Sequence, residues 1–127
     1  MDINNLNILV LAYLGDNIYE YYVRKFLISK NIPNVDMLQK ESINYVSAKK
    51  QSEYLLSMLD KNILLEDEID IMKRARNHKG NRHPKNCDIV TYKNATGLEA
   101  VIGYLELTNK RNRIEELMNL ILGGTLC

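Results

Sequence analysis

Apolar residues recur at intervals of three and four positions along most of this chain, and no other feature limits its fold as strongly. The first such stretch covers residues 5–29 and includes Leu6, Val10, Tyr13, Leu14, Ile18, Tyr21, Tyr22 and Phe26. This spacing places apolar side chains on one face of an α-helix. The pattern returns over residues 37–59, 66–77, 91–108 and 111–122. Because no stretch alternates as a β-strand would, we expect an all-α fold with about five main helices.

The segments between these helices carry helix-breaking residues. Pro33 interrupts "KNIPNVD", and Asp36 is the expected N-cap of the second helix. Residues 78–90 include Gly80 and Pro84 and are predicted to form a loop. Glycines 123 and 124 are expected to end the last helix.

Composition favours one globular domain over residues 1–127. The chain is 46% hydrophobic and 26% charged, a balance typical of folded proteins rather than disordered ones. No apolar run approaches the roughly 18 residues that a membrane span needs. The N-terminal stretch "MDINNLNILV" lacks the basic region of a signal peptide, so we expect a cytoplasmic protein.

Charge is unevenly distributed although the net charge is only +1. Residues 66–70 read "EDEID", whereas residues 73–85, "KRARNHKGNRHPK", hold six of the 17 lysines and arginines and no acid. A concentrated basic segment is typical of proteins that bind a polyanion. An ordinary solvated loop explains the charge equally well.

Two acidic residues stand out because their neighbours are apolar. Asp16 lies in "LAYLGDNIY" beside Gly15, and Glu99 lies in "GLEAVIGYL" between Gly97 and Gly103. Helices that cross at glycines can bring two carboxylates into one pocket, where they would suit Mg²⁺ and phosphodiester hydrolysis. The alternative is that each acid lies at the solvent boundary of its helix or pairs with a base, although neither has a lysine or arginine three or four positions away.

Five stretches in order resemble the ribonuclease III family. "LAYLGDNIYEYYV" resembles the signature helix of its catalytic domain, "ATGLEAVIGYLEL" resembles its second motif, and "YVSAKKQSEYLL" resembles the helix between them. With "RARNHK" and "PKN", these stretches are most similar to the short branch that lacks a double-stranded RNA-binding domain. The resemblance extends over about residues 8–122.

The resemblance implies a helical bundle of the ribonuclease III catalytic type that forms a homodimer. It implies Mg²⁺-dependent cleavage of double-stranded RNA that leaves 5′-phosphate ends, in maturation of the 23S ribosomal RNA precursor. Asp16 and Glu99 match the essential aspartate and the metal-binding glutamate of the two motifs. Ala12 and Thr96 stand where the larger enzymes have two further acids, and the short branch shares both losses.

We expect no separate RNA-binding domain in a chain of this length, so the basic segment is the candidate RNA-binding surface. Its candidate contacts are Lys73, Arg74, Arg76, Lys79, Arg82 and Lys85. A ribosomal protein or the pre-ribosome is a further partner that the resemblance suggests. The tyrosines at 19, 21, 22 and 104 suit either a subunit interface or ordinary core packing.

Two other functions compete with the enzyme. A catalytically degenerate domain that binds structured RNA or the ribosome would explain the missing acids at Ala12 and Thr96. The presence of Asp16 and Glu99 opposes that interpretation. A helical protein-interaction module leaves the acid-free basic segment unexplained.

Overall fold

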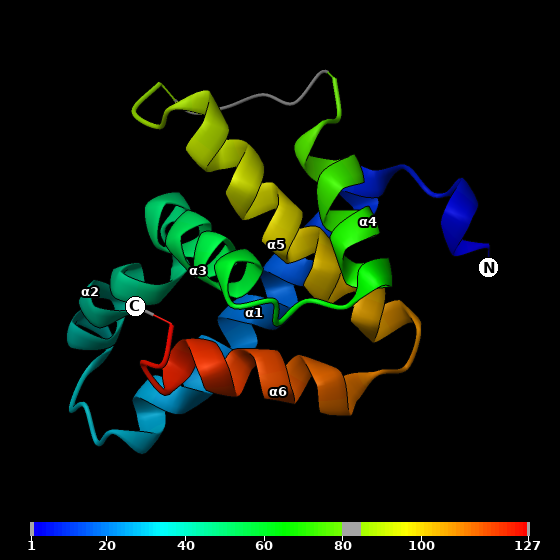
Figure 1. Ribbon diagram of the computed structural model, residues 1–127. Helices are drawn as coiled ribbons and strands as arrows, with labels where there is room; N and C mark the ends of the chain where they lie inside the picture. Colours follow the sequence, from blue (N-terminus) through cyan, green and yellow to red (C-terminus); the bar gives the residue numbers. More distant parts are fainter. Residues whose placement is uncertain (1, 80–84, 127) are drawn as a thin grey trace.

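The fold is all-helical, as the sequence predicts. The computed structural model describes residues 2–79 and 85–126, and within these ranges it contains no strand. Six α-helices follow a short 3₁₀ turn at Ile3–Asn5 (Figure 1). They are α1 (Ile8–Ser29), α2 (Val35–Val46), α3 (Ala48–Asp60), α4 (Glu66–Arg76), α5 (Ile89–Leu107) and α6 (Arg111–Leu122). None of these helices is long and apolar enough to cross a membrane.

The single helix predicted for residues 37–59 is wrong, because Ser47 divides it into α2 and α3. Ser47 has an extended backbone, with φ −62° and ψ 150°, and both ends α2 and begins α3. Its hydroxyl accepts the backbone N–H of Lys50 at 3.2 Å, so the side chain replaces a helical partner.

The N-cap predicted at Asp36 is also wrong. Asn34 occupies that position, and its side-chain oxygen accepts the N–H of Met37 at 2.9 Å. Asp36 instead lies in the first turn of α2, where its charge complements the helix dipole. At the start of α5, Asp88 is the cap and accepts the N–H of Val90 at 2.9 Å.

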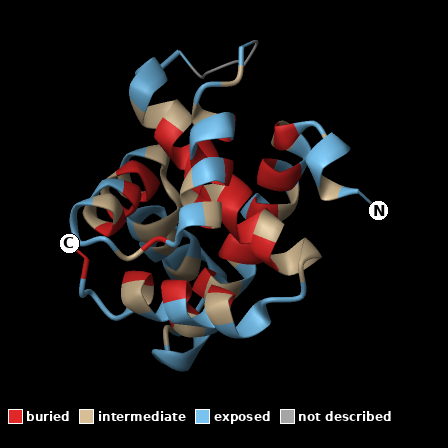
Figure 2. Cartoon of the chain, turned by 45° about the vertical axis from the view of Figure 1, so that its right-hand side comes forward, coloured by how far each residue is buried: buried red, intermediate tan, exposed pale blue. Residues whose placement is uncertain are grey.

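Helix α5 forms the centre of the bundle. It packs against α1, α3 and α4, and its middle turns are buried on nearly every side (Figures 1 and 2). Leu98, Val101, Ile102 and Leu105 are fully inaccessible to solvent. A helix that is apolar all round has to be covered by its neighbours, which explains why three helices surround this one.

A buried ion pair joins α4 to α6. Glu68 is 1% exposed, and both of its carboxylate oxygens accept from the Arg113 guanidinium, at 2.8 and 2.9 Å. Arg113 also donates to the backbone carbonyl of Ile63 at 2.8 Å. The acidic stretch 66–70 therefore has a structural role at Glu68.

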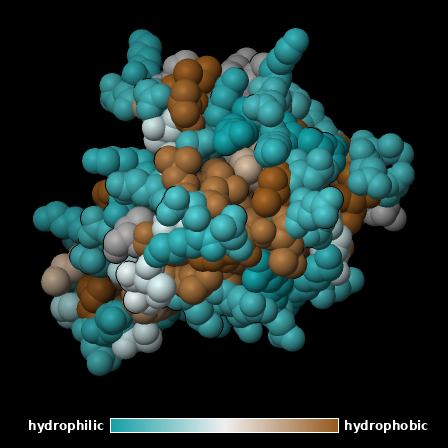
Figure 3. Space-filling model, in the orientation of Figure 1, coloured by the Kyte–Doolittle hydropathy of each residue, from teal (hydrophilic) through white to brown (hydrophobic). Residues whose placement is uncertain are grey.

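The face of the molecule seen in Figure 3 is hydrophilic at its edges and hydrophobic near its middle.

Candidate active site

Helices α1 and α5 cross with their backbones in direct contact, and glycine makes this possible on both sides. A Cβ on Gly15 would overlap the carbonyl oxygen of Glu99 and lie 2.6 Å from its carbonyl carbon. A Cβ on Gly103 would lie 2.8 Å from the carbonyl carbon of Leu11. No side chain larger than hydrogen fits at either position, so the close helix crossing predicted from the glycines is present.

This crossing brings the carboxyl groups of Asp16 and Glu99 together. The two side chains share a hydrogen bond, with Asp16 exposed and Glu99 half-buried. Burial raises the pKa of Glu99 to about 9, and the hydrogen bond to Asp16 and its negative charge contribute to that rise in pKa. At neutral pH the Glu99 carboxyl therefore holds a proton, which it donates in the hydrogen bond to Asp16.

Two further side chains from α1 and α3 face Glu99. Gln51 hydrogen-bonds to the Glu99 carboxyl, and this bond lowers the pKa of Glu99. The negative charge of Glu20 raises that pKa. Glu20 also forms an ion pair with Arg24, one helical turn further along α1, at 3.5 Å. The sequence did not predict a site role for Gln51, because a glutamine within "SAKKQSEY" has the composition of a solvated helix face.

The donor set suits one divalent cation held by two carboxylates. Across the described residues, no group of three or more histidine, cysteine, aspartate or glutamate side chains could hold a metal. Ala12 and Thr96, where the larger enzymes have further acids, are both buried, and the Thr96 hydroxyl donates to the Tyr92 carbonyl at 3.0 Å. A cation would take the place of the proton shared by Asp16 and Glu99, and Mg²⁺ often binds through two carboxylates and several waters.

The basic segment lies apart from the acid pair, toward the N-terminal end of α5. Lys73, Arg74 and Arg76 belong to the last turn of α4, while Lys79 and Lys85 flank residues 80–84. The candidate contact Arg82 lies outside the described residues. In the ranges that are described, none of the other five candidate contacts is ion-paired with an acid. Glu99 lies ten residues along α5 from Ile89, or about 15 Å.

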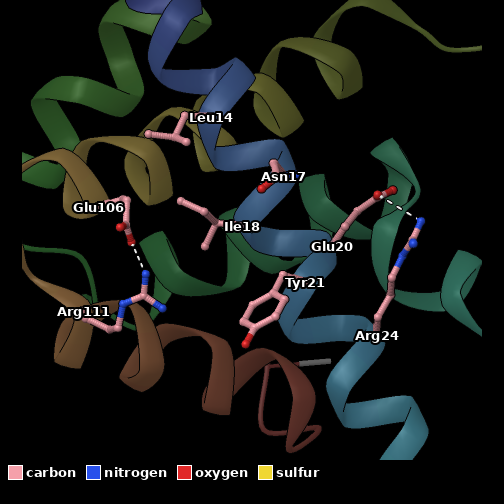
Figure 4. Close-up of a pocket in the computed structure, with 8 residues that line it drawn as sticks. All are labelled: Leu14, Asn17, Ile18, Glu20, Tyr21, Arg24, Glu106 and Arg111. Carbon is pink, nitrogen blue, oxygen red and sulfur yellow. Dashed lines mark hydrogen bonds and ion pairs between the residues drawn. The ribbon is translucent and has the colours of Figure 1, made fainter.

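A pocket of about 690 Å³ lies between α1 and the junction of α5 with α6 (Figure 4). Asn17, Glu20 and Tyr21 line it from α1. Across the pocket, Arg111 donates to Glu106 at 2.7 Å. The lining is mixed in polarity, as expected of a surface that meets a protein or a nucleic acid rather than a small apolar ligand.

The tyrosines divide between packing and exposure. Tyr19 is fully buried and donates to the carbonyl of Tyr45 at 2.6 Å, and Tyr104 donates to Asp67 at 2.7 Å, so both belong to the internal packing. Tyr21 is 51% exposed. Tyr13, which was not predicted to be an interface residue, is 83% exposed.

Comparisons with known proteins agree with this geometry. The family model described as Ribonuclease III domain matches residues 9–110. A protein of Enterococcus faecalis is 44% identical over 118 residues, which cover 93% of this chain and 89% of the relative. A protein of Clostridium tetani is 46% identical over 122 residues, which cover 95% of this chain and 80% of the relative. A crystal structure of a Fusobacterium nucleatum protein superimposes with a TM-score of 0.86 at 37% identity and covers 98% of both chains.

The chain therefore belongs to the ribonuclease III family, and it is an endoribonuclease that cleaves double-stranded RNA. Both relatives from Enterococcus and Clostridium are named Mini-ribonuclease 3, the short branch that the sequence motifs indicate. Membership in this family favours the enzyme over the degenerate RNA-binding domain. The proximity of the two retained acids, Asp16 and Glu99, favours it as well.

Proposed function

We propose that this endoribonuclease uses Mg²⁺ held by Asp16 and Glu99, and that residues 1–127 act as one catalytic domain. The observation that carries the proposal is the shared hydrogen bond between the two carboxyl groups at the glycine crossing. A protonated glutamate beside an aspartate is a costly arrangement that a divalent cation would relieve.

The chain supplies position and charge to the reaction. Bound Mg²⁺ supplies a more acidic water and neutralises charge on the phosphate oxygens. Asp16 and Glu99 provide the anionic oxygens that hold it, and Glu99 has to release its proton to do so. The main-chain contact at Gly15 fixes the two carboxylates relative to each other. Family membership supports hydrolysis that leaves 5′-phosphate and 3′-hydroxyl ends.

The basic segment is proposed to hold the RNA duplex. Lys73, Arg74 and Lys79 are exposed and lack acidic partners in the described ranges, so they are available to phosphates. Duplex RNA is recognised mainly through its shape, its phosphates and its 2′-hydroxyls, so we expect weak sequence preference. Ile89, which follows the segment, lies about 15 Å along α5 from Glu99, so one duplex can reach both the segment and the acid pair.

We propose that two copies pair through one face of α1. Val10, Tyr13 and Tyr21 are 47%, 83% and 51% exposed, and their spacing of three and eight positions places them on the same side of the helix. Exposed aromatic residues are enriched where protein surfaces associate. A homodimer of this kind would present two acid pairs to one duplex, one for each strand.

The proposed substrate is the precursor of 23S ribosomal RNA, with a ribosomal protein or the pre-ribosome as a further partner. The similarity to relatives named Mini-ribonuclease 3 supports this substrate class. A cytoplasmic location follows from the proposed substrate.

Cleavage of a perfect RNA duplex and of precursor ribosomal RNA tests the proposal. We expect cutting with Mg²⁺, none with EDTA, and a loss of at least ~100-fold in Asp16→Asn and Glu99→Gln, since each removes one anionic donor. Glu116→Gln is the control, because it neutralises an exposed acid of α6 that pairs with Arg113 and does not line the pocket. Cutting that survives EDTA or both site substitutions would overturn the metal mechanism.

A further inference from the structure

The Gln51 side chain is a buried amide at the edge of the acid pair. Gln51 lies on α3 within the first turns after Ser47, and only 2% of it is exposed. Helix α3 packs against α5, which carries Glu99. A glutamine this deeply buried is uncommon unless its amide has a specific function.

Hydrogen bonds account for only one end of this amide. The nitrogen Nε2 donates to the carbonyl of Val46 at 3.3 Å, and the side chain also hydrogen-bonds to the Glu99 carboxyl. The oxygen Oε1 is inaccessible to solvent and has no hydrogen-bond partner. A buried acceptor without a donor is unfavourable, so a group that donates to Oε1 would stabilise the site.

A second buried amide gives a useful comparison. Asn94 of α5 is 3% exposed, and its oxygen Oδ1 likewise has no partner. Its nitrogen donates to the hydroxyl of Ser52 at 3.0 Å rather than to either acid. Gln51 and Asn94 are therefore matched in burial and in their unpaired oxygen, but only Gln51 contacts the acid pair.

We propose that Gln51 is a positioning residue of the metal site, with its N–H orienting Glu99 and its Oε1 accepting a hydrogen bond from a water ligand of the cation. This inference rests on the proposed function of Asp16 and Glu99. Mg²⁺ keeps several waters when few carboxylates hold it, and those waters need acceptors. Outer partners of metal ligands typically change metal affinity 10- to 100-fold.

Thermal unfolding of the RNA-free protein across a Mg²⁺ titration tests the inference without relying on cleavage. Ligand binding to the folded state raises the unfolding temperature as the concentration passes the dissociation constant. We expect Gln51→Met, which keeps the size and removes both hydrogen-bonding ends, to require at least ~10-fold more Mg²⁺ for the same rise. Cleavage should recover at high Mg²⁺, because the affinity for the cation is weakened while Asp16 and Glu99 remain.

Two further variants separate this function from simple packing. Gln51→Glu keeps an acceptor oxygen and should bind Mg²⁺ more tightly than Gln51→Met. Asn94→Leu removes the matched amide and should leave the Mg²⁺ dependence within about twofold of wild type, well below the shift expected for a partner of a metal ligand. A Gln51→Met titration that overlays the wild type, or an equal loss in Asn94→Leu, would overturn the inference. If Gln51→Met does not fold, Gln51→Glu provides the test. Mg²⁺ binding by Gln51→Glu at least ~10-fold weaker than that of wild type would overturn the proposed function of Oε1.

Asp16→Asn distinguishes the inference from the function beneath it. If Asp16→Asn retains wild-type Mg²⁺ binding, the metal site itself is wrong. If Asp16→Asn loses binding while Gln51→Met keeps it, only the positioning function of Gln51 is wrong.

Discussion

The backbone of Gly15 on α1 lies directly against the main-chain carbonyl of Glu99 on α5. Only the hydrogen atom on the Cα of Gly15 fits between the two helices at this point. Gly15→Ala would force the two helices apart, because the new Cβ would meet backbone rather than a flexible side chain. We expect a loss of at least ~2 kcal/mol in the free energy of unfolding, measured in urea, together with reduced cleavage.

Gly97→Ala is the matched control for this prediction. Its Cβ would lie 3.1 Å from Cγ and 3.2 Å from the carbonyl oxygen of Met72, a milder overlap than the 2.6 Å to the Glu99 carbonyl carbon at Gly15. The predicted order of destabilisation is Gly15→Ala above Gly97→Ala. Equal losses would show that the crossing at Gly15 tolerates a methyl group.

Stability in EDTA should fall as pH rises, because of Glu99. Its pKa is about 9 in the folded chain against an ordinary value of 4.5, so the folded protein holds a proton that the unfolded chain loses between these values. The contribution of Glu99 to stability is thus complete below pH 4.5 and is lost as the pH rises toward 9. Glu99→Gln cannot lose this proton, so its unfolding temperature should exceed that of wild type at about pH 9 by at least ~3 °C.

The same comparison at pH 4.5 is the control, since Glu99 is protonated in the folded state there. The two unfolding temperatures should differ less under these acidic conditions than near the raised pKa of Glu99. If the unfolding temperatures of wild type and Glu99→Gln differ by the same amount at every pH, the assignment of a protonated Glu99 is contradicted.

Removing one partner of the buried Glu68–Arg113 pair should lower the free energy of unfolding far more than removing one partner of an exposed pair. Arg113→Leu would leave the Glu68 carboxylate buried without its guanidinium, and we expect a loss of about 3–5 kcal/mol in urea unfolding. Arg24→Ala removes the exposed pair with Glu20 and should cost at most ~1 kcal/mol. Similar losses in both variants would mean that Arg113 does not compensate a buried charge.

Charge reversal in the basic segment should weaken RNA binding and flatten its dependence on salt. We expect the double variant Arg74→Glu, Arg76→Glu to reduce the slope of log affinity against log salt by about 1–2, because two phosphate contacts are lost. Binding to a labelled duplex between roughly 50 and 200 mM salt gives the measurement. Lys40→Glu on α2 is the control, and an unchanged slope in the double variant would remove the segment from the RNA interface.

Tyr13 should control the oligomeric state. Tyr13→Asp places a charge on the proposed pairing face of α1, so the variant should sediment as a monomer where the wild type is a dimer. Ile43→Asp alters an apolar residue of α2 that is 60% exposed and should remain dimeric. A monomeric wild type would reject the homodimer, and a dimeric Tyr13→Asp would reject this face.

The sequence allowed the glycine crossing to be predicted because two independent stretches each pair a glycine with an acid on an apolar helix. Ser47 was missed because residues 47–53, "SAKKQSE", contain no proline or glycine, and one hydroxyl is a weak signal for the end of a helix. Gln51 was missed for a different reason. Its neighbours are polar, and only the packing of α3 against α5 buries it.

The direct contact between the backbones of α1 and α5 has a practical consequence for redesign. Because the main chain rather than the surrounding leucines and isoleucines sets the separation of Asp16 and Glu99, the interior away from the crossing is open to exchange. Thermostabilising substitutions at positions such as Ile114, Leu117 and Ile121 of α6 can be screened there. Gly15 and Gly103 are the two positions that such a library has to hold constant.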